Sequence, residues 1–199
     1  RFEGHYQPRQ PLWGYQLDDD PVVMEQQIDE ATDYGVDVFI FDWYWYDGKP
    51  FLEEALNDGF LKARNKDKMR FYLMWANHNV PGNMWNPYRY KTDALVFEGS
   101  VDQDAYKSLV DRVVNTYFKQ PNYYKIDNRP VFSIYSLEEL VQSFNGLEGT
   151  KKGLEYLRDE TIKAGFEGLH LQLVGKYGKN NTPSLGKGFT NVEQLLKLL

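Results

Sequence analysis

The chain has 199 residues, a net charge of −6 and no cysteine, a length that suits one domain with a sizeable core. The lack of cysteine excludes disulfides and thiolate metal sites, and the lack of any Lys/Arg-rich run argues against duplex nucleic acid as a partner. No apolar run approaches the ~20 residues that cross a bilayer, so we expect a soluble protein without membrane insertion and leave its compartment, cytoplasmic or extracytoplasmic, open.

The first elements predicted are an arm, two helices and two strands. Residues 1–17 have an irregular pattern. Asp20 is a good N-cap and Pro21 suits the first helical position, so a helix should run to about Tyr34 and end at Gly35. A strand over residues 36–42 is apolar on both faces, which is typical of a strand covered on both sides. We expect a second helix from Pro50, followed by a strand over 71–75.

The rest of the chain continues the alternation of helices and strands. Residues 76–101 form a long loop, and such loops often cover a site. Asp102 should cap a helix that ends near Phe118. The remaining predicted elements are a strand over 131–135, helices over 137–144 and 150–164, a strand over 169–174, a loop over 176–188 and a helix over 191–199.

This alternation predicts an α/β fold with a parallel sheet wrapped in helices. Four strands and their helices fill the chain, whereas a complete (β/α)8 barrel usually takes ~250 residues. The chain therefore forms either part of a barrel or a small open sheet. No G-x-G-x-x-G or P-loop pattern follows a predicted strand, so a nucleotide-binding version of the open sheet lacks support.

Two predicted strands end in polar and aromatic residues. The first ends at Asp42 and continues as Trp-Tyr-Trp-Tyr, and the second ends at Trp75 and continues as Ala-Asn-His-Asn. Aromatic rings can stack on the apolar faces of a sugar, while Asn, His and Asp can bond its hydroxyls. Aromatic residues make up 16% of the chain, so we expect some rings to line a surface groove as well as the core.

Each of these residues also has a structural interpretation. Asn77 and Asn79 can cap their own loop, and His78 can be hydrogen-bonded without a ligand role. We expect Asp42 to be partly buried, where it binds a sugar hydroxyl or else makes a salt bridge or strand-end cap. Trp43 and Trp45 share one side of the strand and Tyr44 and Tyr46 the other, but the sequence does not decide which pair faces the groove.

No metal or organic cofactor is predicted. The histidines are His5, His78 and His170, and they show no spacing that suits metal ligands. His170 falls at the start of its strand, away from the predicted site, and is interpreted as structural. The chain opens at Arg1 rather than Met, so we expect it to be cut from a longer protein.

Five segments in order resemble the WbsX-like family, which is also described as glycoside-hydrolase-family-99-like and related to endo-α-mannosidases. They are residues 4–8 (Gly-His-Tyr-Gln-Pro), 41–49 (Phe-Asp-Trp-Tyr-Trp-Tyr-Asp-Gly-Lys), 75–79 (Trp-Ala-Asn-His-Asn), 123–131 (Tyr-Tyr-Lys-Ile-Asp-Asn-Arg-Pro-Val) and 134–135 (Ile-Tyr). The resemblance implies a bacterial glycoside hydrolase (a glycosidase) with a (β/α)8 TIM-barrel fold, acting on oligosaccharide or polysaccharide.

Three departures from the family pattern shape this interpretation. The family's first strand precedes the 4–8 segment, and many members have Glu where this chain has His78. The family's late Asn-Glu-Trp-x-Glu-Gly segment, which would carry the catalytic carboxylates, is absent from this chain. We therefore expect residues 1–199 to be one incomplete barrel domain, with about strands two to five, that belongs to a longer catalytic domain.

The predicted role of this chain is to contact the substrate, while the catalytic pair lies outside it. The acids expected on the side of the site are Asp42, Asp47 and Glu98, and of these Asp42 and Glu98 are the candidate catalytic groups. The predicted substrate-binding residues are His5, Asp42, Trp43, Tyr44, Trp45, Tyr46, Trp75, Asn77, His78, Asn79, Trp85 and Tyr135.

Two other functions stay open. A glycosyltransferase of polysaccharide biosynthesis would need a nucleotide-sugar or lipid-linked donor. Against it, no phosphate-binding loop or Asp-x-Asp motif follows a strand, and the Asp18 to Asp20 run precedes a helix. A non-catalytic sugar-binding domain is favoured by the missing carboxylates and disfavoured by the barrel-like order of elements.

Overall fold

The computed structural model describes residues 4, 6, 9–86, 88, 94–174, 176–177 and 183–184, with only the backbone given for Trp85 and for the residues after Val174. The chain divides into two compact units. One comprises Arg1–Asp37 and Glu53–Met69, and the other comprises Val38–Leu52 and Arg70–Leu199. The parallel strands all belong to the second unit.

The first helix begins and ends where its capping residues predict. Helix α1 spans Pro21–Asp33, and the side chain of Asp20 accepts a hydrogen bond from Val22 N at 2.9 Å. Gly35 follows the helix with a φ of 82°, which is a conformation that favours glycine. This element of the prediction is confirmed.

In the same unit, α1 is joined to the short helices η1 (Ala55–Gly59), η2 (Phe60–Lys62) and η3 (Lys66–Lys68). Arg64 Nη2 lies 2.9 Å from Glu25 Oε2, and Lys68 Nζ lies 2.8 Å from Asp29 Oδ1. Side-chain hydrogen bonds from Arg64 lower the pKa of Glu25. Three of the four side chains in these ion pairs are exposed, so the pairs fix the geometry more than they add stability.

The helix predicted from Pro50 is wrong at its start. Pro50 lies in a short strand, β2 (Lys49–Phe51), which pairs antiparallel with the end of β1 (Val38–Tyr46). The turn between these strands is formed by Asp47 and Gly48, with φ values of 52° and 71°. A type I′ hairpin turn requires two positive φ values, and β2 is an edge strand, where proline is tolerated.

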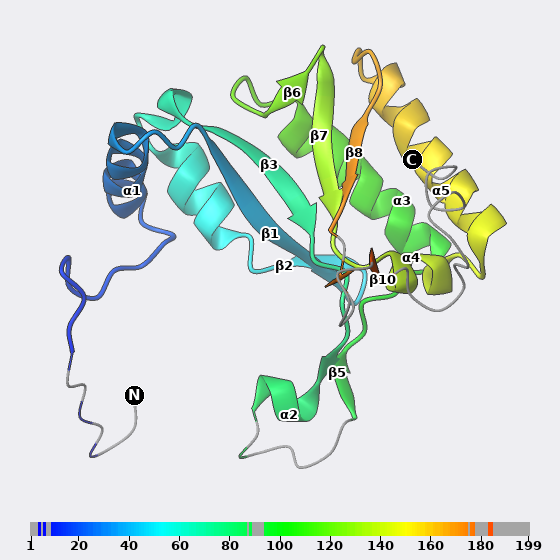
Figure 1. The fold of residues 1–199 in the computed structure, drawn as a ribbon, viewed down its shortest axis with the longest axis horizontal. Helices are drawn as coiled ribbons and strands as arrows, with labels where there is room; N and C mark the ends of the chain where they lie inside the picture. The colour runs from blue at the N-terminus through cyan, green and yellow to red at the C-terminus, as the bar shows by residue number, and fades with distance from the viewer. Residues whose placement is uncertain are drawn as a thin grey trace. The chain divides into compact units, whose positions relative to one another are not determined.

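Parallel strands form the main sheet of the second unit. Its other strands are β3 (Arg70–Trp75), β6 (Lys125–Ile126), β7 (Arg129–Ile134) and β8 (His170–Leu173). Strands β1, β3, β7 and β8 pair in parallel in that order, which is also their order in the chain (Figure 1). The strands predicted over 71–75, 131–135 and 169–174 are confirmed, and the first predicted strand extends further, to Tyr46.

Helices cover one face of this sheet. They are α3 (Gln103–Arg112), which continues as η4 (Val113–Phe118), and the pair α4 (Leu137–Ser143) and α5 (Leu147–Lys163). Phe118 of η4 packs against Phe132 of β7, with ring centroids 6.1 Å apart. Tyr106 of α3 donates a hydrogen bond to Gly153 O of α5 at 3.0 Å, so α5 packs beside α3. The covered face holds the core of the unit.

The opposite face of the sheet is more open. Ile40 in the middle of β1 is 55% exposed, and Asp42 on the same face is exposed. Tyr72 and Met74 of β3 are half-buried there. The expectation that the first strand is covered on both sides is therefore wrong for the part of the chain that the structure describes.

The long loop predicted over 76–101 contains structure of its own. Strands β4 (Val80–Pro81) and β5 (Leu95–Phe97) pair antiparallel, and a short helix, α2 (Gly82–Trp85), lies between them. This excursion projects away from the sheet in Figure 1. It separates the end of β3 from the start of α3.

The described residues thus form a mixed α/β fold with a parallel sheet, and no closed barrel is present among them. Two-residue strands β9 (Lys176–Tyr177) and β10 (Pro183–Ser184) pair with each other, and the helix predicted over 191–199 lies outside the described residues. Within the described ranges, no helix has the length and apolar character needed to cross a membrane.

Candidate functional site

The segments that follow β1, β3 and β7 meet at one edge of the sheet. Trp43 of β1 is in register with Trp75 of β3, which is in register with Ile134 of β7. Because these strands are parallel, the residues after them emerge side by side. In parallel α/β sheets this carboxyl edge is where ligands bind.

The tryptophans at this edge belong to the core. Trp43, Trp45 and Trp75 are only 2%, 4% and 1% exposed. The ring of Trp43 lies 6.2 Å from that of Tyr117, and the ring of Trp75 lies 6.3 Å from that of Tyr106. Both partners are on the helices that cover the sheet. These tryptophans were predicted to contact the substrate, but in the structure their rings are buried, with Trp43 and Trp75 packed toward the helices.

The other face of the same edge brings Tyr44, His78 and Tyr135 together. The ring of His78 lies edge-on to both tyrosines, with centroids 6.1 Å from Tyr44 and 5.6 Å from Tyr135. Partial burial raises the pKa of the Tyr44 hydroxyl, and the nearby charge of Asp42 raises it further. We call Asp42, Tyr44, His78 and Tyr135 the strand-end cluster, which draws residues from three strand ends.

The cluster is accessible to a ligand. Tyr44, His78 and Tyr135 are half-buried. Asp42 is exposed, so the expectation of a partly buried carboxyl is wrong: its side chain lies on the open face of the sheet. Two aromatic rings, an imidazole and a carboxylate on one surface can stack on a sugar and bond its hydroxyls.

The side chain of Asn77 connects the segments that follow β3 and β7. It is 1% exposed, and both ends of its amide are used. Its Oδ1 accepts from Ser136 N and its Nδ2 donates to Ser136 O, each at 2.7 Å. The structural interpretation therefore fits Asn77 better than the predicted substrate contact, and its partner is a distant backbone segment rather than its own loop.

Asn79 joins three segments of the chain. Its Nδ2 donates to Glu139 Oε1 at 2.9 Å, and its Oδ1 accepts from Gly99 N at 2.8 Å. These bonds connect the loop after β3 with α4 and with the segment that leads to α3. Asn79 therefore holds the position of His78 beside it.

Tyr46 holds the same loop from β1. Its hydroxyl donates to His78 O at 3.0 Å, and its ring stacks on Phe97 with centroids 5.0 Å apart. Burial, and secondarily the neighbouring Tyr44, raise the pKa of Tyr46 to about 12, so the hydroxyl stays protonated and can donate. Tyr46 is itself buried, which makes it a support for His78 rather than a surface contact.

Gly99 is a supporting residue that the sequence did not reveal. A Cβ at this position would lie 2.6 Å from the carbonyl carbon of His78 and 2.8 Å from that of Asn77. The segment after β5 therefore crosses directly over the backbone of the cluster, and only glycine fits there. A single glycine in a loop gives no signal of such a close approach.

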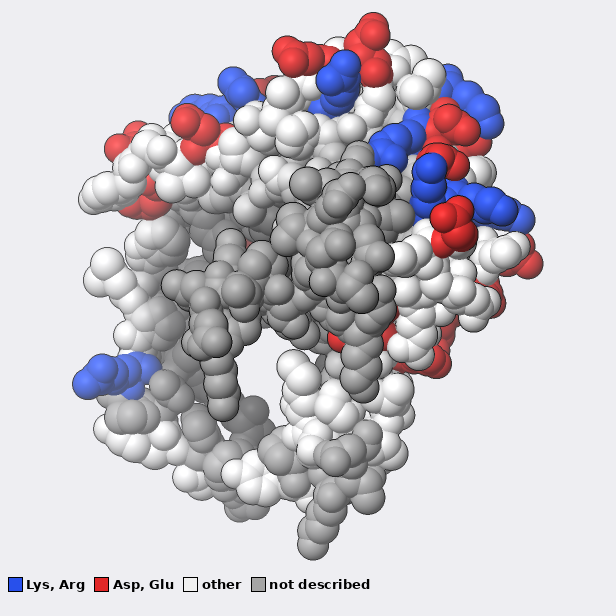
Figure 2. Space-filling view, turned by 45° about the vertical axis from the view of Figure 1, so that its right-hand side comes forward, with Lys and Arg blue, Asp and Glu red and all other residues white. Residues whose placement is uncertain are grey.

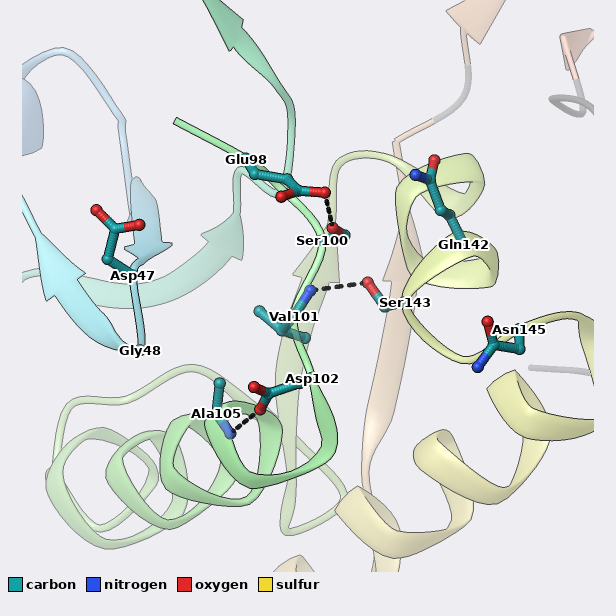
Figure 3. Close-up of a pocket in the computed structure, with 10 residues that line it drawn as sticks. All are labelled: Asp47, Gly48, Glu98, Ser100, Val101, Asp102, Ala105, Gln142, Ser143 and Asn145. Carbon is teal, nitrogen blue, oxygen red and sulfur yellow. Dashed lines mark hydrogen bonds between the residues drawn. The ribbon is translucent and has the colours of Figure 1, made fainter. Parts of the chain in front are cut away.

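A polar cavity lies close by in the same unit. Its volume is about 720 Å³, and carboxylates from the β1–β2 turn, the segment after β5 and the cap of α3 surround it (Figure 3). We call it the acidic cavity, and its main polar side chains are those of Asp47, Glu98, Asp102, Gln142 and Asn145. Glu98 accepts a hydrogen bond from Ser100 Oγ at 2.8 Å, and Asp102 accepts one from Ala105 N at 2.8 Å.

The two candidate catalytic acids occupy different places. Glu98 lines the acidic cavity, whereas Asp42 lies in the strand-end cluster and is not among the cavity's lining residues. Of the other predicted contacts, His5 and the side chain of Trp85 lie outside the described residues. No three described His, Asp or Glu side chains lie close enough together to hold one metal ion.

Charges on the surface are mixed. On the face shown in Figure 2, Lys and Arg side chains lie among Asp and Glu side chains rather than in a basic patch. The chain as a whole carries a net charge of −6.

Comparison with known proteins identifies the family. The family described as "Glycosyltransferase WbsX" matches residues 1–195. This chain belongs to the WbsX family. The chain is also similar to two proteins from strains of Xanthomonas campestris pv. campestris, both described as "Uncharacterized protein WxcX".

These WxcX relatives are much longer than the chain. Each is 34% identical over 139 residues, which is 68% of this chain and 19% of the relative. No solved structure gives a significant match. The WbsX family points to a carbohydrate-active enzyme, which agrees with the sugar-compatible side chains of the strand-end cluster.

Proposed function

We propose that this chain forms the substrate-binding wall of a glycoside hydrolase that acts on oligosaccharide or polysaccharide. The observation that carries the proposal is the contact of His78 with Tyr44 and Tyr135 at the carboxyl edge of the sheet. The tyrosine rings would stack on a pyranose ring, and His78 and Asp42 would bond its hydroxyls. Neither interaction needs a cofactor.

The order of the strands supports a (β/α)8 barrel as the parent fold. Strands β1, β3, β7 and β8 lie in space in the order in which they occur in the chain. A barrel has this arrangement, whereas a doubly wound sheet reverses direction at a switch point. In a barrel, the open face that carries Asp42 and Tyr44 would point inward, toward the substrate at the barrel mouth.

The catalytic pair is proposed to lie elsewhere in the longer protein. Glycoside hydrolysis usually needs two carboxyl groups that flank the scissile bond. Asp42 is the carboxylate placed with the cluster, and Glu98 faces a separate cavity. Asp42 would then bind or orient a sugar hydroxyl next to groups supplied by other strands.

A glycosyltransferase is the second candidate, and the printed description of the family favours it. A transferase would take a nucleotide-sugar or lipid-linked donor, whose phosphates need cationic or backbone N–H partners. The acidic cavity offers carboxylates instead. This charge favours the hydrolase.

Enzyme assays on the full-length protein separate the two functions. A hydrolase should release reducing ends from a bacterial polysaccharide without any donor, and His78→Ala or Asp42→Asn should lower the rate by roughly 10–100-fold. Tyr34→Ala, which removes an exposed ring outside the cluster, should leave the rate unchanged. Turnover that requires a nucleotide-sugar would favour the transferase, and full activity in both cluster variants would reject the proposed site.

A further inference from the structure

Ser133 is a buried residue whose hydroxyl the fold does not use. It lies near the end of β7 and is only 4% exposed, yet its hydroxyl forms no hydrogen bond with another described residue. By contrast, the buried hydroxyls of Thr150 and Thr161 donate to carbonyls of the backbone at 2.8 Å and 2.7 Å. A buried hydroxyl without a partner destabilises a fold, so Ser133 calls for a reason outside the fold, such as a ligand.

The side chain of Ser133 points to the open face of the sheet. The preceding residue, Phe132, packs on Phe118 of the covering helices with ring centroids 6.1 Å apart, and successive side chains of a strand point to opposite faces. Tyr135, two residues after Ser133, belongs to the strand-end cluster. Ser133 therefore lies on the same face as the cluster, further from the carboxyl edge of the sheet.

The strand register places Ser133 in a row with three other residues of this face. The register pairs, from β1 to β8, are Asp42 with Met74, Met74 with Ser133, and Ser133 with Gln172 (Figure 1). We call these four residues the inner row. Asp42 is exposed, Met74 is half-buried, Ser133 is buried and Gln172 is again half-buried. Ser133 has the shortest side chain of the inner row and is its deepest point.

Gln172 adds a second unused polar group beside Ser133. Its side chain is half-buried and forms no hydrogen bond within the described part of the chain. Neighbouring strands lie about 4.8 Å apart, so the amide of Gln172 and the hydroxyl of Ser133 can bind one small group together. Both side chains donate and accept, and neither carries a charge. The pair therefore suits an alcohol, which also donates and accepts.

The spacing between the inner row and the strand-end cluster decides which alcohol reaches this pair. Residues two apart along a strand are separated by about 7 Å, so a sugar ring that contacts Tyr135 lies about that far from Ser133. The ring hydroxyls of a sugar are attached to the ring itself, whereas the hydroxymethyl group of a hexose extends one carbon further. Because longer side chains flank Ser133, the longer arm is the group that reaches it.

We propose that Ser133 and Gln172 bind the hydroxymethyl group of a hexose unit whose ring contacts the strand-end cluster. This inference rests on the proposed function, since it takes the ligand of the chain to be a sugar. It adds two substrate-binding residues and one required feature of the substrate, a free hydroxymethyl group. The site then selects hexoses over the corresponding pentoses.

Titration of the chain with matched methyl pyranosides, followed by amide chemical shifts, tests the inference. Three pairs with the same anomeric configuration differ only in the hydroxymethyl group: D-glucoside and D-xyloside, D-galactoside and L-arabinoside, and D-mannoside and D-lyxoside. In the pair that binds best, the hexoside should bind about tenfold more tightly than the pentoside, since each neutral hydrogen bond contributes only a few-fold in affinity. It should also shift the amides of Ser133 and Gln172 more strongly.

Substitutions that remove the two polar groups leave the net charge unchanged. In Ser133→Ala and in Gln172→Leu the hexoside should bind about as weakly as the pentoside. Ser108→Ala, which removes an exposed hydroxyl on α3, should keep the preference. The melting temperature of Ser133→Ala should not fall, because the hydroxyl has no partner to lose. A full hexoside preference in either variant would overturn the inference, and a lowered melting temperature of Ser133→Ala would assign its hydroxyl to the fold instead.

The same titration separates this inference from the proposed function. If both members of a pair shift the amides of Tyr44 and His78 and bind with equal affinity, the inference is wrong and the proposed function stands. If the hexoside is preferred but shifts only the amides of Ser133 and Gln172, the hydroxymethyl assignment stands and the strand-end cluster is wrong. If no glycoside shifts either group of amides, both are wrong.

Discussion

The side-chain amide of Asn77 forms two hydrogen bonds with the backbone of Ser136, each 2.7 Å long. Asn77 follows β3 and Ser136 follows β7, so one side chain joins the ends of neighbouring parallel strands. The joint lies directly beneath His78 and Tyr135, which are the adjacent residues in each segment. The geometry of the strand-end cluster thus depends on a side chain that is itself buried.

Removing this joint should destabilise the fold. Asn77→Ala leaves the part-buried N–H of Ser136 without its acceptor, while Ser136 O keeps its bond from Leu140 N, so the cost should be about 1–3 kcal/mol. Asn115→Ala, which removes an exposed amide on η4, should cost less than about 0.5 kcal/mol. Urea unfolding monitored by circular dichroism measures both, and similar losses in the two variants would contradict the role given to Asn77.

Truncation of Trp43 and of its neighbour Tyr44 on β1 should have different effects on the free energy of unfolding. Trp43→Ala empties a buried site and should lower the free energy of unfolding by about 3–5 kcal/mol. Tyr44→Ala should lower it by less than about 1 kcal/mol because the ring is half-exposed, yet it should abolish the ring's contact with sugar. Thermal unfolding distinguishes the two, and a stable Trp43→Ala variant would show that the faces are assigned incorrectly.

Gly99→Ala should disturb the cluster without changing any polar group. Its added methyl would approach the His78 backbone within 2.6 Å, so the loop must move. Overpacking of this kind costs about 1–3 kcal/mol. The amide chemical shifts of residues 77–79 should all change in Gly99→Ala. In Ser100→Ala, the changes should stay close to residue 100. Unmoved resonances at His78 would rule out the close packing.

The Tyr46 hydroxyl predicts a loss of stability in alkaline solution. Burial raises its pKa from 10.0 to about 12, so the folded state holds the proton more tightly than the unfolded chain does. The contribution of this hydroxyl to the free energy of unfolding is complete below pH 10 and declines as the pH rises from 10 to about 12. An ultraviolet titration should show a phenol ionising near pH 12 that is missing in Tyr46→Phe. Identical titration curves for the wild type and Tyr46→Phe would argue against a raised pKa of Tyr46.

Local signals in the sequence predicted most elements of the fold. Asp20 and Asp102 cap helices as expected, and each side chain accepts from its own first turn. The Asp47–Gly48 turn was missed, although Asp-Gly between aromatic segments is a strong hairpin signal. Pro50 suggested a helix start instead, and the edge position of β2 that permits proline is a tertiary feature.

The candidate site was predictable only in part. The strand ends indicated which segments meet, and His78, Tyr44 and Tyr135 do come together. Alternation could not decide whether the tryptophans or the tyrosines face the helices, because both faces of the strand are rich in aromatic residues. The roles of Asn77 and Asn79 depend on partners 59 and 60 residues away, which a local pattern does not contain.

Calorimetric titration of a neutral oligosaccharide into the wild-type chain, Tyr44→Ala and His78→Ala tests the central claim most directly. We predict binding to the wild type that weakens by roughly tenfold or more in each variant, while Tyr34→Ala binds as the wild type does. Equal affinity in all four proteins would contradict the assignment of the strand-end cluster as a sugar-binding surface.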